Sequence, residues 1–134
     1  MSSPFRVLLV DDSAAMRSFV SATLEAEGTY AVTVATSGFQ ALKVLPRERF
    51  DLIITDINMP DINGLELIRF VRQSAHLRGV ALLIISTQSS ERDAARALAL
   101  GADQFLAKPF TPEALREAAV KSLDAARGRR GGAA

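Results

Sequence analysis

Five short apolar runs alternate along the chain with stretches whose apolar residues recur at helical spacing. Each run is four to six residues long and rich in valine, leucine or isoleucine, a pattern typical of strands buried on both faces. We predict strands at 5–10, 30–35, 51–55, 80–85 and 104–107. A strand followed by a helix, repeated five times, predicts the α/β fold class.

The stretches between the strands carry start and stop signals for helices. Thr111 suits the N-cap of the last helix and Pro112 its first residue. The predicted helices run from Ser13 to near Gly28, over 37–45, from about Leu65 through Val71, from about 90 to 100, and from 112 to about Ala126. The remaining sequence, RGRRGGAA, has no apolar periodicity. We therefore expect one folded domain over 1–126 and a disordered basic tail over 127–134.

Continuous apolar strands that alternate with helices predict a parallel sheet covered on both faces. Right-handed crossovers leave few possible strand orders, and for five strands the flavodoxin-like order 2-1-3-4-5 is expected. The predicted architecture is a (βα)5 flavodoxin-like three-layer sandwich. In such a sheet, ligands bind beyond the carboxyl ends of the strands, near the switch point between strands 1 and 3.

Polar residues follow four of the five predicted strands. They are Asp11 and Asp12, Asp56, Ser86 and Thr87, and Lys108. Parallel strands end at one edge, so three carboxylates, a hydroxyl and a lysine are expected to converge there. Close carboxylates repel unless a cation binds, and oxygen ligands without histidine or cysteine suit Mg²⁺. A lysine suits a phosphoryl group, and a carboxylate is a known phosphoryl acceptor.

The composition excludes several kinds of site and of protein. The chain has no cysteine and one histidine, His76, which excludes disulfides and thiolate or histidine-rich metal sites. No apolar run is long enough to span a membrane and no signal sequence is evident, so a cytoplasmic protein is expected. The net charge of +1 comes from 16 basic and 15 acidic residues. Without the three arginines of the tail, 13 basic residues face 15 acidic ones, a net charge of −2.

Four motifs together resemble the receiver domain of bacterial two-component response regulators. They are VLLVDDS at 7–13, DLIITDINMPDINGLEL at 51–67, LIIST at 83–87 and GADQFLAKPF at 101–110. The resemblance covers the chain up to its tail and implies a stand-alone, CheY-like phosphoprotein of a phosphorelay.

The resemblance implies a role for each acidic residue. Asp56 corresponds to the phospho-acceptor, which becomes an aspartyl phosphate. Asp11 and Asp12 correspond to the acidic pair that holds Mg²⁺, with Asp56 and the backbone carbonyl of Asn58 as the other protein ligands. Lys108 corresponds to the lysine that pairs with the acceptor and then with the phosphoryl oxygens.

Further positions around the site follow from the same resemblance. A cis peptide bond before Pro109 is implied, which would aim the preceding lysine inward. Ser86, by its spacing from that lysine, corresponds to the switch hydroxyl and Phe105 to the switch aromatic, where tyrosine is commoner. Thr87 stands where alanine is usual, and Gln88 occupies a position that tunes phosphoryl lifetime.

The function implied is a response regulator and not an enzyme, since it catalyses only its own phosphorylation and dephosphorylation. Its phosphoryl donor would be a sensor histidine kinase or a phosphotransfer protein. A protein target would be controlled through the face formed by the helix at 90–100, the strand at 104–107 and the last helix. No DNA-binding domain is expected, and chemotaxis or motility is a plausible pathway.

Two alternatives remain at this point. One is a pseudo-receiver, a scaffold of the same fold that acts without phosphorylation, for which Phe105 leaves room. The other is a phosphohydrolase of the haloacid-dehalogenase type, which also uses an aspartate nucleophile and Mg²⁺. That class needs a second aspartate where this chain has Ser13.

Overall fold

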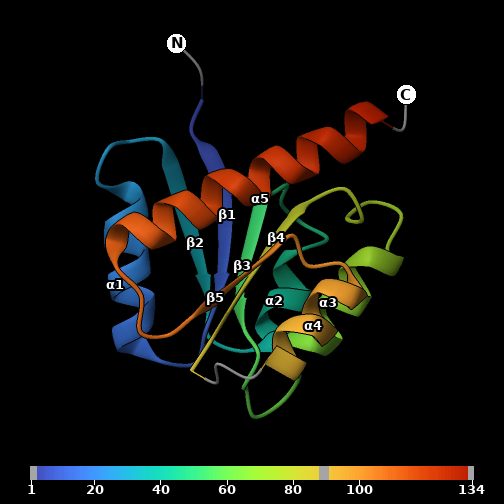
Figure 1. Cartoon of the computed structure of the whole chain (residues 1–134), viewed down its shortest axis with the longest axis horizontal. Helices are drawn as coiled ribbons and strands as arrows, with labels where there is room; N and C mark the ends of the chain where they lie inside the picture. The colour runs from blue at the N-terminus through green and yellow to red at the C-terminus, as the bar shows by residue number, and fades with distance from the viewer. Residues whose placement is uncertain (1–2, 88–90, 133–134) are drawn as a thin grey trace.

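A computed structural model of the chain describes residues 3–87 and 91–132, in which five strands and five helices alternate (Figure 1). The elements are β1 (Phe5–Val10), α1 (Ala14–Glu25), β2 (Tyr30–Ala35), α2 (Gly38–Val44), β3 (Leu52–Asp56), α3 (Gly64–Gln73), β4 (Ala81–Ser86), α4 (Glu91–Leu100), β5 (Gln104–Ala107) and α5 (Pro112–Gly132). All strand pairs are parallel, and the order is β2-β1-β3-β4-β5. The predicted flavodoxin-like α/β fold is confirmed.

Two hydrophobic cores lie on opposite faces of the sheet. Val7 and Leu9 of β1 pack into the core under α1 and α5, whereas Leu8 and Val10 pack into the core under α2, α3 and α4. Figure 1 shows α5 crossing the strands on one side of this three-layer arrangement. Every residue of β3 and β4 is buried, as expected for central strands covered on both faces.

The two central strands end one residue later than the sequence predicts. Asp56 is the last residue of β3 because it pairs with Ile85, and Ser86 is the last residue of β4 because it pairs with Ala107. Both polar side chains are therefore held by regular sheet and not by a loop, which fixes where they lie at the carboxyl edge.

Two helix starts show how local sequence sets the element bounds. Thr111 accepts a hydrogen bond from the backbone amide of Ala114 at 3.1 Å, and Pro112 is the first residue of α5, as predicted. The start of α3 is a reciprocal capping box between Asn63 and Glu66, which satisfies two amides that a helix end leaves without partners.

The structure corrects the predicted disordered tail over 127–132, because α5 continues past Ala126 to Gly132, while 133–134 lie outside the described residues. Arg129 forms an ion pair with Asp103, and it also donates a hydrogen bond to the Val80 carbonyl at 3.2 Å. Polar interactions of Arg129 therefore hold this end of the helix, and the pattern of apolar residues does not reveal them. Neither α5 nor any other described helix is both long and apolar enough to cross a membrane.

Candidate functional site

Three carboxylates gather at the carboxyl edge of the sheet. Asp11 and Asp12 follow β1, and Asp56 ends the neighbouring strand β3. One carboxylate oxygen of each lies within 4.8 Å of the others. Asp11 is fully buried, Asp56 is 6% exposed and Asp12 is exposed. The predicted convergence of the three acids is confirmed, since the order of the strands makes β1 and β3 neighbours.

Lys108 brings a positive charge to the same cluster. It follows β5, and its backbone amide donates to the Ser86 carbonyl at 2.7 Å, which continues the ladder between β4 and β5. Its Nζ lies 3.4 Å from the Oδ2 of Asp11 and 3.4 Å from the Oδ2 of Asp56. The side chain is only 8% exposed. One lysine is therefore shared between two buried carboxylates.

The charge on Asp56 is incompletely compensated. Burial raises the pKa of this carboxyl above its usual value, and the nearby charge of Asp11 raises it further. Lys108 and a hydrogen bond from the Asn58 amide lower the pKa but do not cancel the rise. The cluster therefore lacks positive charge, which favours binding of an additional cation.

Replacing Asp56 by asparagine is expected to raise the thermal unfolding midpoint by a few degrees at neutral pH in EDTA. A raised pKa means that the fold retains the proton to higher pH than the unfolded chain does, so stability falls as pH rises through that window. Asparagine carries no charge and so removes the cost of burying one at neutral pH. Calorimetry of the natural chain and the Asp56→Asn variant measures the two unfolding midpoints, and Asp12→Asn is the control at an exposed position. A lower midpoint for the Asp56 variant would contradict the electrostatic account.

Local hydrogen bonds hold Asp11 in place. Asp11 accepts a hydrogen bond on Oδ1 from the Ser13 amide at 2.9 Å, which leaves Oδ2 facing Lys108. The guanidinium of Arg17, on the first turn of α1, donates to the Asp11 carbonyl at 2.8 Å. Arg17 therefore fastens the start of α1 to the end of β1, a bond that the sequence alone does not indicate.

The remaining predicted residues lie around this cluster at different depths. Ser86 is fully buried at the end of β4, while Thr87 directly after it is exposed. Phe105 on β5 is half-buried and packs against the core under α2, α3 and α4. The peptide bond before Pro109 is cis. Gln88 lies outside the described residues.

The loop from β3 to α3 is fastened to the start of α2 by Asp61, which sequence reasoning missed. Its carboxylate accepts hydrogen bonds from the backbone amides of Gly38 at 3.3 Å and Phe39 at 2.9 Å. These bonds lower the pKa of Asp61, the Phe39 amide most strongly. A Cβ on Gly38 would lie 2.7 Å from the Cβ of Ile62, so glycine permits the close approach. The loop that contains Asn58 is thereby held beside Asp56.

Gly64 also holds this loop close to the end of β3. A Cβ there would lie 2.9 Å from the Cα of Ile57 and closer still to the Asp56 carbonyl oxygen. Gly64→Ala is therefore expected to lower the free energy of unfolding by about 1 to 3 kcal/mol, because backbone must move. Gly128→Ala, an open position on α5, is the control and should be neutral or stabilising by up to about 1 kcal/mol. Urea denaturation measures both, and equal stabilities would refute the steric argument.

The donor atoms fit a hard divalent cation. All three acidic side chains offer oxygen, and no histidine or cysteine lies among them. Oxygen-only ligands suit Mg²⁺, which keeps several waters and binds through one or two carboxylates together with phosphate oxygens. Asp11, Asp12 and Asp56 are thus the residues able to hold the ion, in an acidic triad of the type that binds magnesium in receiver domains.

Fold and site together define a receiver of two-component signalling. The response regulator receiver domain family matches residues 7–120, and the chain belongs to this family. Membership implies a histidine kinase as partner, and CheY-like members are not enzymes beyond the chemistry of their own phosphorylation. The site also favours a receiver over the phosphohydrolase alternative, which needs an aspartate at position 13. Here Ser13 caps α1 instead, by accepting a hydrogen bond from the Met16 amide at 3.2 Å.

Chemotaxis proteins are among the similar sequences and structures. The chain is 35% identical over 113 residues to a chemotaxis protein CheY homolog of Campylobacter jejuni, covering 84% of this chain and 87% of that protein. It is 34% identical to chemotaxis protein CheY1 of Helicobacter pylori, covering 84% and 91% of the two chains. The structure of chemotaxis response regulator CheY4 of Vibrio cholerae matches with a TM-score of 0.83 and 37% identity, covering 89% of this chain and 98% of the other.

Proposed function

We propose that the protein is a response regulator that accepts a phosphoryl group on Asp56 from a phosphohistidine and passes the signal to a partner protein. The donor is a sensor histidine kinase or a phosphotransfer protein. The observation that carries the proposal is the arrangement around Asp56, with two further carboxylates on one side and the Nζ of Lys108 at 3.4 Å.

The proposed transfer is a substitution at phosphorus. An Oδ of Asp56 attacks the phosphorus, the O–P bond forms as the P–N bond breaks, and the leaving imidazole keeps the electron pair. Lys108 stays at the site and turns its charge from the carboxylate to the phosphoryl oxygens. Asp11, Asp12, Asp56 and the Asn58 carbonyl would hold Mg²⁺, which would supply further positive charge toward those oxygens.

We further propose that the new phosphate is read by Ser86 and Phe105. A phosphate adds about −1.5 to −2 charges, which attract a hydroxyl donor. Ser86 is buried at the end of β4, and Phe105 is half-buried on the adjacent strand β5. Movement of Ser86 toward the phosphate would let the ring of Phe105 turn inward, which shifts a two-state equilibrium of the α4–β5–α5 face.

The α4–β5–α5 face is the proposed partner surface. Leu98 on α4 and Val120 on α5 are 48% and 50% exposed, and the same two helices carry the exposed Arg92, Arg96 and Lys121. Apolar side chains rimmed by charges are typical of protein interfaces. The chemotaxis relatives make chemotaxis or motility our proposed pathway.

Intact mass spectrometry tests the transfer. The protein is incubated with acetyl phosphate and Mg²⁺, and one phosphoryl adduct is expected. The adduct should be lost in EDTA and in the Asp56→Asn variant, while Asp51→Asn, an aspartate at the opposite edge of the sheet, should behave as the unchanged chain. If no adduct formed under any condition, including with a phosphorylated kinase as donor, the result would instead support a pseudo-receiver.

Solution NMR tests the switch separately. Beryllofluoride with Mg²⁺ mimics the phosphoryl group, and amide shifts are expected to extend from Asp56 to residues of α4, β5 and α5. Shifts confined to the carboxyl edge would contradict the switch while leaving the phosphoryl transfer intact.

A further inference from the structure

A concave site lies at the amino edge of the sheet, opposite Asp56. It is a groove of about 700 Å³ between the α2–β3 connection and the end of α3 with the α3–β4 connection. Residues 45–50 form one side, and Phe70, Ser74, His76, Leu77, Gly79 and Val80 form the other. We call this site the basic groove. Its volume lies in the range of sites that enclose a ligand or a bulky side chain.

Aromatic and aliphatic side chains form the walls of the basic groove. Phe70 on α3 lines the groove and is 42% exposed. Phe50 is half-buried on the opposite wall, with the guanidinium carbon of Arg6 5.2 Å from its ring centroid. Leu77 is also half-buried. The groove therefore offers an apolar surface that the described part of the chain leaves open.

The charges of the basic groove are positive on balance. Arg47 and Arg49 line it, are exposed, and form no ion pair with any residue in the described ranges. Its one acidic residue, Glu48, is paired with Arg6. The nearby Asp51 accepts a hydrogen bond from the Arg6 amide at 2.8 Å.

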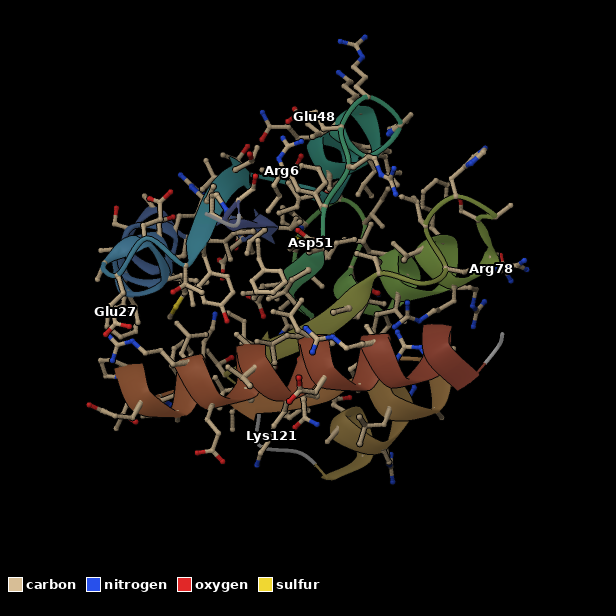
Figure 2. All side chains as sticks on the ribbon, turned by 90° about the horizontal axis from the view of Figure 1, so that it is seen from above. Arg6, Glu27, Glu48, Asp51, Arg78 and Lys121 are labelled. Carbon is tan, nitrogen blue, oxygen red and sulfur yellow. The ribbon has the colours of Figure 1, made fainter. Side chains whose placement is uncertain are left out.

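Figure 2 looks onto this edge from above and shows Arg6 beside Glu48, with Arg78 further along the same edge. Arg78 is exposed and adds to the positive charge at this end of the molecule. The acids of the amino edge are thus engaged by Arg6, while the arginines of the groove remain available to a ligand.

We propose that the basic groove binds an acidic peptide segment of a partner protein. The carboxylates of the segment pair with Arg47 and Arg49, whose planar guanidinium groups match carboxylates in geometry. An aromatic or large aliphatic side chain of the segment packs between Phe70 and Phe50. Arginine and aromatic residues carry most of the binding energy in protein interfaces, and Arg47, Arg49 and the exposed Phe70 provide both here. This site is independent of Asp56 and of the proposed function.

The test is fluorescence anisotropy of a short labelled peptide in which glutamates flank a phenylalanine. The natural chain is expected to bind it, and the charge-reversed variant Arg47→Glu with Arg49→Glu to bind about tenfold more weakly or worse. Arg116→Glu, on α5 and outside the lining of the groove, is the charge-reversal control and should bind normally. Phe70→Ala should also weaken binding, and because this side chain is already exposed the fold is kept.

Three outcomes of the anisotropy measurement would overturn the proposal. They are no binding by the natural chain, equal binding by the charge-reversed variant and the control, and equal binding of a peptide with glutamines in place of glutamates. The last would indicate a purely apolar groove. Amide shifts induced by the peptide must also map to 45–50 and 70–80, since shifts on α4 would place the peptide elsewhere.

Discussion

Alanine in place of Lys108 is expected to slow phosphorylation by acetyl phosphate about 10²- to 10³-fold, the cost of removing one preorganised charge from a developing anion. The Nζ lies 3.4 Å from an oxygen of Asp11 and of Asp56, and the side chain is only 8% exposed. In the proposed transfer its charge therefore needs little reorganisation to reach the phosphoryl oxygens. The rate of adduct formation by intact mass measures the effect, and Lys43→Ala, an exposed lysine on α2, is the control.

Magnesium binding separates this role of Lys108 from a loss of structure. The Lys108→Ala variant is expected to bind Mg²⁺ at least as tightly as the natural chain, because a cation that repels the metal is gone. Isothermal titration at fixed ionic strength measures the affinity. If metal binding and phosphorylation were lost together, the site would have collapsed and the electrostatic role would be unsupported.

The second large effect concerns Asp103, for which Asp103→Ala is expected to lower the free energy of unfolding by about 3 kcal/mol. This carboxylate is 4% exposed, and it pairs with Arg72 at 3.2 Å and with Arg129. It also accepts a hydrogen bond from the Leu82 amide at 2.9 Å. Removing it leaves a buried amide and a largely buried guanidinium without their partner.

Arg72 makes further hydrogen bonds in the network around Asp103. Arg72 also donates to the Gly101 carbonyl at 2.9 and 2.7 Å and to the Val80 carbonyl at 2.6 Å, so it ties the end of α4 to the start of β4. Burial lowers the pKa of Arg72, and the nearby Arg129 lowers it further, while Asp103 raises it.

Arg129→Ala is the matched variant for this prediction. Its side chain is 41% exposed, so its loss is expected to cost less than about 1 kcal/mol. Chemical denaturation compares the two variants. If Asp103→Ala were no less stable than Arg129→Ala, the buried carboxylate would not be the centre of the network.

The carboxyl edge was predictable because it follows from topology. Once five strands alternate with helices, Asp11, Asp56 and Lys108 must end on one edge, whichever loops join them. The ends of β3 and β4 were each predicted one residue early, since Asp56 and Ser86 are held in the sheet by neighbours on other strands. Local sequence does not contain that pairing.

The contacts that escaped sequence reasoning are polar and long-range. Asp61 bonds to amides of α2, and Asp103 pairs with arginines on α3 and α5. Each looks like an ordinary loop or edge aspartate in the sequence, since its partners are more than twenty residues away. The helical end of α5 was missed for the same reason. It is held by the ion pair of Arg129 and not by apolar residues at helical spacing.

The central claim is that Asp56 itself carries the phosphoryl group, and chemical mapping of the adduct tests it most directly. Borohydride reduces an aspartyl phosphate to homoserine, and tandem mass spectrometry of the digested protein then locates the modified position. After incubation with acetyl phosphate and Mg²⁺, we predict homoserine at position 56 and unmodified aspartate at positions 11 and 12. Homoserine at position 11 or 12, or at none of the three, would contradict the account.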